Sequence, residues 1–472
     1  MPIVNKKKRS LDAHLSVKPT SFHKTLSDFF DNDYRKFSIY VLQERCAPSI
    51  ADGFRVGARK ALYSAFVGTL KHHGLEKMLT LIGDSMKLSQ YQHGEAGLLS
   101  SIKSISATFM HNLNPLFVKG QNGSLRVPDN VASPRYLSVK LSDYSFIYEY
   151  DSDLWENLIE ENMVIEPKFF LPPVCTLLCS QNIGLAPGYK YQLSVPYNPI
   201  DVIDAQIEYL KNKKITTKLK PFVRGMNNNN FSYSEKSKRW TTFSEYNLFE
   251  KSSTVQVTDL CYGNTFASFE NNLNKLLEKG LIRDWKNFSK RGAMDYKIIF
   301  EPKDFQRLSR PENKNELEKM LLLTQVIPQN IFNIINEKNK LQYFDDEYAL
   351  LKHFCDWRLT IYEQRKTKLI SVMEERYKKN NEICEFISLV NSGKIKIQNR
   401  KKADIKEDLK KFNLSADVLQ TEISKLTDEE KALLIKKNEE LQKELEYVRN
   451  TTILDMFLKD LKDIKKKIKD DF

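Results

Sequence analysis

The chain has 472 residues, 41% of them hydrophobic, and its 74 Lys and Arg against 61 Asp and Glu give a formal net charge of +13. This length is too great for one ordinary core, so we expect two or three packed units. The charge favours a polyanionic partner, either nucleic acid or an acidic membrane surface. No apolar run approaches the ~20 residues of a membrane helix, and the basic segment Lys6–Arg9 leads into polar sequence, which predicts neither a membrane span nor a signal peptide.

The six cysteines are scattered along the chain and predict no disulfide framework. Cys175 and Cys179 have no second pair and no nearby histidine with which to complete a zinc site. We therefore expect reduced, mostly buried thiols in a soluble protein of the cytoplasm or nucleoid.

Residues 1–33 match no pattern, and we interpret them as a flexible basic arm. Residues 34–110 are typical of short helices separated by Gly and Pro, with an amphipathic helix over Glu95–Phe109. This pattern favours a helical DNA-binding unit. Residues 111–200 place Gly, Pro, Asn and Tyr clusters between short apolar runs, which favours a loop-rich segment that carries a site.

The next region mixes both kinds of element. We predict a strand at Thr254–Thr258, a helix at Phe266–Gly280 and a strand at Tyr296–Phe300, and we interpret Asn227–Asn230 as a solvated turn. This part of the chain is therefore predicted to be α+β.

Beyond residue 340 the pattern is helical. One stripe with helical spacing consists of Leu350, Phe354, Trp357 and Ile361. A second consists of Leu434, Leu441, Leu445 and Val448, and it follows a possible capping box at Thr427 and Glu430. We predict two long antiparallel helices with the basic segment Asn391–Asn413 as a knob at their end; a solvated coiled coil is the alternative.

One pair of residues can carry chemistry. The turn G-Q-N-G-S at 120–124 precedes A-S-P-R-Y at 132–136. A tyrosine has an ordinary pKa of ~10, so as a nucleophile toward phosphate it needs a nearby cation, which Arg135 supplies for Tyr136. Taken alone, an Arg-Tyr pair is more often a matter of packing.

The surrounding sequence resembles the DNA-cleaving region of type IIA DNA topoisomerases. The segments that carry the resemblance lie in the family's order and are R-C-A-P-S-I-A-D-G-F-R at 45–55, A-R-K-A-L-Y at 58–63, Y-Q-H-G-E at 91–95, the two segments around Tyr136, I-E-P-K-F-F-L-P-P at 165–173, N-I-G-L-A-P-G at 182–188, V-N-S-G-K-I-K-I-Q-N-R at 390–400 and I-S-K-L-T-D-E-E at 423–430. The resemblance spans about residues 34–465, and within the family the chain looks most like the medium subunit of T-even-type bacteriophage topoisomerases.

The resemblance implies a mostly helical α+β fold in four parts. These are the N-terminal arm (1–33), a winged-helix DNA-gate domain with the catalytic tyrosine (34–145), an α/β tower domain (146–335) and a long antiparallel coiled coil with a distal dimerisation gate (336–472). No sequence remains for a DNA-wrapping domain, which implies relaxation or decatenation rather than negative supercoiling.

The resemblance also assigns roles to individual residues. Tyr136 would attack a DNA phosphate and form a transient 5′-phosphotyrosine, with Arg135, His93 and Arg45 around the scissile phosphate. Four polar residues would contact DNA, namely Arg55, Arg59, Lys60 and Gln121. Leu185 would be an apolar wedge that enters the base stack, although a buried core leucine is the alternative. Gln92 departs from the family, which usually has His there.

The implied partners are double-stranded DNA, a second copy of the chain at the DNA gate and at the far helix ends, and a large subunit, together a heterotetramer. The large subunit would hold Mg²⁺ in its TOPRIM domain and would bind ATP. No metal site is predicted in this chain, because the acidic pair Asp151 and Asp153 lacks the required strand context. Two rivals remain: a non-catalytic basic architectural protein, and an enzyme specialised for recombination breaks, which should lack the two-helix gate.

Overall fold

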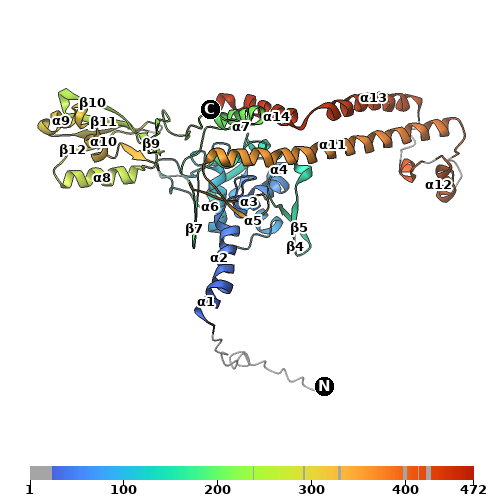
Figure 1. The fold of residues 1–472 in the computed structure, drawn as a ribbon, viewed down its shortest axis with the longest axis horizontal. Coiled ribbons are helices and arrows are strands. Elements are labelled where there is room, and N and C mark those ends of the chain that lie inside the picture. Colours follow the sequence, from blue (N-terminus) through green and yellow to red (C-terminus); the bar gives the residue numbers. More distant parts are fainter. Residues whose placement is uncertain are drawn as a thin grey trace, which may run out of the picture.

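The computed structural model describes residues 24–472 except for 238, 291–292, 328–330, 397–400, 413 and 421–426. Figure 1 shows a central body, a lobe of strands and helices on one side, and a long helix pair on the other. The fold is mixed α+β with about half of its residues in helices, rather than mostly helical as predicted. Separate buried clusters form the cores of the body, the lobe and the tip of the helix pair.

A helical run projects from the body before the first core element (Figure 1). Its consecutive segments are α1 (Leu26–Asp28), η2 (Phe29–Tyr34), α2 (Arg35–Val41) and η3 (Leu42–Cys46). None of these segments has a buried residue. The run begins inside the predicted 1–33 arm, whose first 23 residues lie outside the described part of the chain.

Short helices build the central body, as predicted for residues 34–110. They are α3 (Val56–Val67), α4 (Thr69–His73), α5 (Met78–Leu88) and α6 (Glu95–Ser106). The amphipathic helix α6 buries Leu98, Ile102 and Ile105 and ends three residues before the predicted Phe109. Beside these helices lies a three-stranded antiparallel sheet in the order β1 (Glu76–Lys77), β3 (Ser138–Leu141) and β2 (Leu116–Lys119).

The segment predicted to be loop-rich consists of short elements on the body. They are η4 (Pro134–Tyr136), η5 (Ser145–Ile147), η6 (Ser152–Leu154), the hairpin of β4 (Asn157–Glu160) and β5 (Met163–Pro167), η7 (Thr176–Cys179), and the hairpin of β6 (Asn182–Ala186) and β7 (Tyr189–Leu193). Helix α7 (Pro199–Asn212) follows and begins at the N-cap Asn198, whose side chain accepts a hydrogen bond from Ile200 N.

The lobe contains the three elements predicted for its sequence. A four-stranded sheet has the order β10 (Glu245–Phe249), β11 (Thr254–Asp259), β13 (Tyr296–Ile299), β12 (Asp284–Asn287), and a three-stranded sheet has the order β14 (Thr324–Val326), β9 (Arg239–Phe243), β8 (Phe231–Ser234). Helices α8 (Phe266–Glu278), α9 (Pro302–Leu308) and α10 (Lys314–Met320) pack with them. Thr265 and Ser268 form a capping box at the start of α8.

The hairpin of β15 (Phe332–Ile335) and β16 (Leu341–Phe344) leads into the longest helix, α11 (Glu347–Asn391). Helix α13 (Asp428–Asn450) runs antiparallel to it, because Glu374 pairs with Arg449 while Asn380 bonds Asn438 further along. The two predicted helices are therefore confirmed. The predicted capping box is not tested, since the side chain of Glu430 lies outside the described residues.

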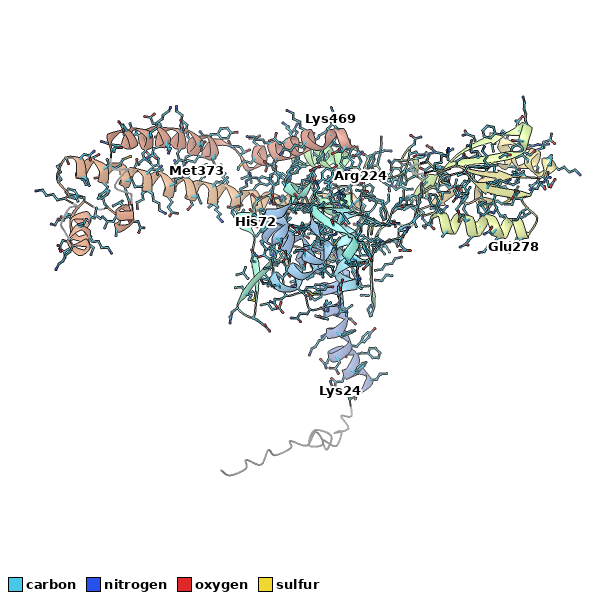
Figure 2. The ribbon with its side chains drawn as sticks, turned by 180° about the vertical axis from the view of Figure 1, so that it is seen from behind. Lys24, His72, Arg224, Glu278, Met373 and Lys469 are labelled. Carbon is cyan, nitrogen blue, oxygen red and sulfur yellow. The ribbon has the colours of Figure 1, made fainter. Side chains whose placement is uncertain are left out.

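The segment between the two helices forms the predicted knob. It contains α12 (Lys402–Lys411) and η10 (Ala416–Gln420), and Figure 1 shows α12 at the far end of α11. The knob has a small core, made of Phe386, Leu389, Ile395, Ile405, Leu409, Leu414 and Val418. From behind, Figure 2 shows Met373 along the shaft of the pair and Lys469 back beside the body, at the end of α14 (Ile453–Ile468).

A buried ion network fixes the helix pair to the body. Arg358 of α11 is fully buried, binds Asp151 and lies 4.8 Å from the ring centre of Tyr362. Arg365 reaches Asp151 at 3.3 Å and Asp460 of α14 at 2.5 Å. Three segments that are distant in sequence are thus joined through shared charges. The carboxylate of Asp151 is paired with two arginines, so its resemblance to an acidic metal motif is superficial.

The buried residue His111 makes the stability of the body sensitive to acid. Burial lowers the pKa of its imidazole from 6.5 to about 3, and the charge of Arg224 adds to the effect. Between these two pH values the unfolded chain binds one more proton than the folded chain, so stability falls as the pH drops through this window. When the pH is lowered from 7 to 5, the free energy of unfolding of the wild type should fall by about 2 kcal/mol more than that of His111→Gln. Urea titration at the two pH values measures this difference, and equal losses in both proteins would refute it.

Candidate active site

Tyr136 lies on the surface at the end of η4, directly before the buried Leu137. Its side chain is 71% exposed, so it does not pack into the core, and Arg135 is exposed beside it. Leu137 anchors this point because its carbonyl accepts a hydrogen bond from Met78 N of α5 at 3.0 Å. The alternation of buried and exposed side chains at this anchor turns the phenol outward.

The predicted Gly-rich turn supports the same loop. Ala132 N donates to Gln121 O at 2.8 Å, and Gly123 N donates to Asn130 O at 3.1 Å. Gly120 has φ +121°, and a Cβ there would lie 2.8 Å from Leu137 Cδ2, so glycine is required. The side chain of Gln121 is exposed on this turn, as a DNA contact would need.

Arg45 and His93 gather around Tyr91, in the segment between α5 and α6. The rings of Tyr91 and His93 are 5.6 Å apart, edge to face. Burial raises the pKa of Tyr91, while the nearby charge of Arg45 opposes that rise. Gln92, the departure from the family, donates to Glu160 Oε1 on β4 at 2.9 Å.

Two of the four predicted catalytic residues, Arg45 and His93, thus lie beside Tyr91, and the other pair, Arg135 and Tyr136, are neighbours on η4. Arg45, His93, Arg135 and Tyr136 are all exposed. Among the hydrogen bonds and ion pairs of the described residues, none involves these four side chains and none links the two pairs. Their polar groups therefore face solvent and are available to an external anion.

Arg59 and Lys60 do not fit their predicted contacts with DNA phosphates. The buried guanidinium of Arg59 binds Asp52, with Nε–Oδ2 at 2.7 Å and Nη2–Oδ1 at 3.0 Å. Lys60 Nζ lies 2.9 Å from Glu166 Oε1, and its side chain is largely buried. Both cations are neutralised inside the protein. For Lys60 a motif match cannot reveal this, because Glu166 lies 106 positions away, whereas the partner of Arg59, Asp52, is only seven positions away and stands in the neighbouring motif.

Leu185 and Arg55 meet at the β6–β7 hairpin. Leu185 is 67% exposed, which excludes the alternative of a buried core leucine. Arg55, predicted to contact phosphate, donates to Asn182 Oδ1 at 2.6 Å and to Ile183 O. The sequence interpretation missed Cys46, whose thiol donates to Leu185 O at 3.0 Å. Its only sequence signal is its position next to Arg45.

No group of three or more His, Cys, Asp and Glu side chains in the described ranges is placed to hold a metal ion. Within those ranges, no helix is long and apolar enough to cross a membrane. All six cysteines are free, and Cys175, Cys179, Cys261 and Cys355 are buried.

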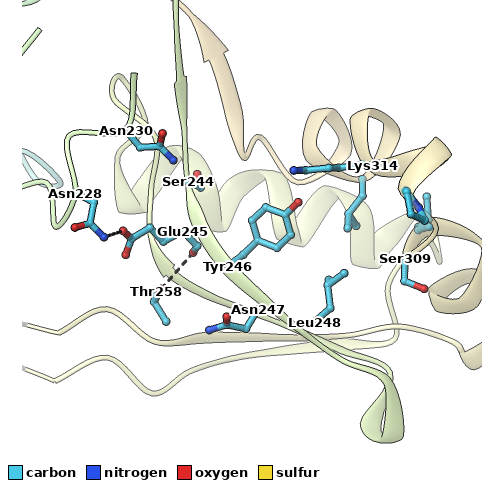
Figure 3. Close-up of a pocket in the computed structure, with 13 residues that line it drawn as sticks. Asn228, Asn230, Ser244, Glu245, Tyr246, Asn247, Leu248, Thr258, Ser309 and Lys314 are labelled. Carbon is cyan, nitrogen blue, oxygen red and sulfur yellow. Dashed lines mark hydrogen bonds between the residues drawn. The ribbon is translucent and has the colours of Figure 1, made fainter. Parts of the chain in front are cut away.

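A hollow of about 700 Å³ lies in the lobe, away from Tyr136, and Figure 3 shows its lining. Tyr246 and Lys314 border it, and Glu245 bonds Asn228 at its edge. Tyr246 Oη donates to Glu318 Oε1 at 3.0 Å, and Ser244 Oγ accepts from Cys261 N at 2.8 Å, so these two lining hydroxyls take part in structural hydrogen bonds.

The family model for the A subunits of DNA gyrase/topoisomerase IV matches residues 45–462 of this chain. DNA topoisomerase 2 of Arabidopsis thaliana is 28% identical over 86% of the chain and 28% of its own length. The DNA topoisomerase medium subunit of Enterobacteria phage T4 is 25% identical over 94% of the chain and 99% of its own length. The chain thus spans about a third or less of the eukaryotic relatives it matches but nearly all of the phage subunit.

A solved structure extends the match to three dimensions. The DNA-binding, cleavage and re-ligation domain of Plasmodium falciparum topoisomerase II superposes with a TM-score of 0.83 and 27% identity. The superposition covers 94% of this chain and 64% of that one. The body, the lobe and the helix pair are therefore arranged as in that domain.

Proposed function

Because the chain belongs to the A-subunit family of DNA gyrase/topoisomerase IV, we propose that it is the DNA-cleaving and rejoining subunit of a type IIA topoisomerase. The observation that carries the proposal is the exposed Arg135-Tyr136 pair, held outward by the buried Leu137 within a fold shared with a topoisomerase cleavage domain. The substrate is double-stranded DNA, consistent with the net charge of +13.

The chemistry is an in-line exchange at one DNA phosphate. The Tyr136 oxygen forms a bond to phosphorus while the bond to the 3′ oxygen breaks, and the phenolic proton ends on the released 3′ hydroxyl. A 5′-phosphotyrosine results, and the reverse step reseals the strand. Arg135, on the same loop, offsets the charge that develops on the phosphate, and Arg45 and His93 donate hydrogen bonds to its oxygens.

A double-strand break requires two tyrosines, so we propose a homodimer that meets at the DNA gate and at the knob of the helix pair. In this proposal residues 34–145 are the winged-helix gate domain, 146–335 the tower and 336–472 the coiled coil with the distal gate. Leu185, exposed at the tip of its hairpin, is the wedge that enters the base stack.

A large subunit completes the enzyme. In line with the family, we assign Mg²⁺ to a TOPRIM domain and ATP to an ATPase domain of that partner. Bound Mg²⁺ would stabilise the attacking and leaving oxygens. The match to nearly the full length of a phage medium subunit supports a separate, T-even-type subunit that works in the cytoplasm of the host.

Reconstitution tests this proposal. The chain is mixed with a T-even-type large subunit, Mg²⁺ and supercoiled plasmid, and the reaction is stopped with detergent and digested with protease. We expect linear DNA joined to protein only when both subunits and Mg²⁺ are present, and relaxation only when ATP is added. DNA binding without any covalent product, from a complex whose assembly is verified by gel filtration, would favour the architectural alternative.

A further inference from the structure

The β6–β7 hairpin, hereafter the wedge hairpin, is fastened to the body along both of its strands. On β7, Gln192 N and O pair with Ile331 at 2.9 and 2.8 Å, and Tyr189 Oη donates to Asn333 O at 2.6 Å. On β6, the contacts come from the segment 45–55, which also carries the site residue Arg45. The exposed Leu185 therefore stands on a base with many attachments rather than on a free loop.

Arg55 supplies the first attachment of β6. Its Nη2 donates to both Asn182 Oδ1 and Ile183 O, so the hydrogens of this nitrogen are directed into the hairpin and not toward solvent. Burial lowers the pKa of Arg55, which agrees with a guanidinium that has lost most of its water. Used in this way, Nη2 of Arg55 holds the hairpin backbone in place, although both of its acceptors are neutral and the cation keeps its charge.

Cys46 supplies the second attachment. Its thiol donates to Leu185 O at 3.0 Å, and its own carbonyl lies against Gly184. A Cβ on Gly184 would come within 2.4 Å of that carbonyl, so only glycine allows the strand to sit so close. Because Gly184 has no left-handed φ, the restriction at this position comes from space alone.

We propose that Arg55, Cys46 and Gly184 clamp the wedge hairpin to the segment bearing Arg45, so that DNA bending by Leu185 and placement of Arg45 at the phosphate occur as one rigid unit. Arg55 is then a positioning residue for the wedge. This inference rests on the proposed function, but it predicts bending and binding properties that need neither the partner subunit nor cleavage.

The test compares variants of the full chain on a short duplex labelled at both ends. Energy transfer reports bending, and anisotropy at several salt concentrations reports affinity and the number of phosphate contacts. The variants are Gly184→Ala, Leu185→Ala, Arg55→Ala and Arg55→Lys, and the control is Gly83→Ala, where a Cβ meets no atom within 4 Å. Thermal melting verifies that each variant is folded.

We expect the DNA affinity of the first three variants to stay within about threefold of the wild-type value, while DNA bending is largely lost. The salt slope, which is the slope of the logarithm of affinity against the logarithm of salt concentration, should be unchanged. Cleavage by the complete enzyme should fall at least tenfold in these three. Arg55→Lys keeps the charge but shortens the clamp, so it should not restore bending. Gly83→Ala should behave as wild type.

Results of two kinds, on the Arg55 variants or on bending, would overturn the clamp. One is a salt slope lower by about one in Arg55→Ala together with recovery in Arg55→Lys, which would make Arg55 a phosphate contact. The other is normal bending by Gly184→Ala, or a wild-type chain that binds DNA without bending it. Absence of cleavage by the wild-type complex would count against the proposed function instead, and the bending series would still decide the clamp.

Discussion

Tyr136→Phe should abolish covalent attachment to DNA while leaving the protein folded and able to bind DNA. The substitution removes only the phenolic oxygen of an exposed side chain, so no packing is lost. Without that oxygen no bond to phosphorus can form, and the yield of protein-linked DNA should drop below about one thousandth of the wild-type value, as expected when a nucleophile is removed.

A matched control separates this effect from the loss of an aromatic hydroxyl in general. Tyr447, near the C-terminal end of α13, is 60% exposed, so Tyr447→Phe makes the same chemical change at a site in the helix pair. It should cleave as wild type in the same detergent-stopped assay. Equal protein-linked product from Tyr136→Phe and wild type would show that another residue is the nucleophile.

Local sequence patterns predict many of the helices and strands. The alternation at Thr254–Thr258 predicts a strand because Val255 and Val257 face one core, and this prediction is confirmed by β11. The helix stripe from Leu350 likewise predicts α11, whose buried face packs on the body. Such elements are determined by their own side chains and by which face is apolar.

Contacts between residues that are distant in the sequence could not be predicted from it. Lys60 and Glu166 are 106 positions apart, and nothing in either segment predicts that the two charges meet. For the same reason Arg55 was interpreted as a phosphate contact, although its acceptors lie on the wedge hairpin. The family motif identifies the positions that hold basic residues, but the fold decides whether a cation points outward or inward.

The neighbours of the candidate site residues show the same contrast between local and long-range pairing. Arg135 and Tyr136 are neighbours in sequence, so the motif places them together. Arg45 and His93 come together only because both lie next to Tyr91, which packs partly against the core.

Asp52→Ala should be the most destabilising of the substitutions considered for the body. Asp52 is fully buried and accepts hydrogen bonds from Arg59 Nε and Nη2, from Phe54 N at 3.0 Å and from Phe170 N at 3.0 Å. Its removal leaves the buried Arg59 cation without its counter-charge and two amides without acceptors. We expect a loss of about 3–5 kcal/mol in the free energy of unfolding, measured by urea titration.

The exposed pair of Glu235 and Lys218, with its charges 3.2 Å apart, provides the control. Glu235→Ala should cost less than about 1 kcal/mol because water already screens that pair. The double variant Asp52→Ala, Arg59→Met should recover part of the loss, since it removes the stranded charge as well. A cost for Asp52→Ala no larger than that for Glu235→Ala would show that the buried pair does not stabilise the fold.

The same pair of residues decides whether Arg59 contacts DNA. If Arg59→Met folded normally and lowered the salt slope of DNA binding by about one, Arg59 would be the phosphate contact that its motif implies.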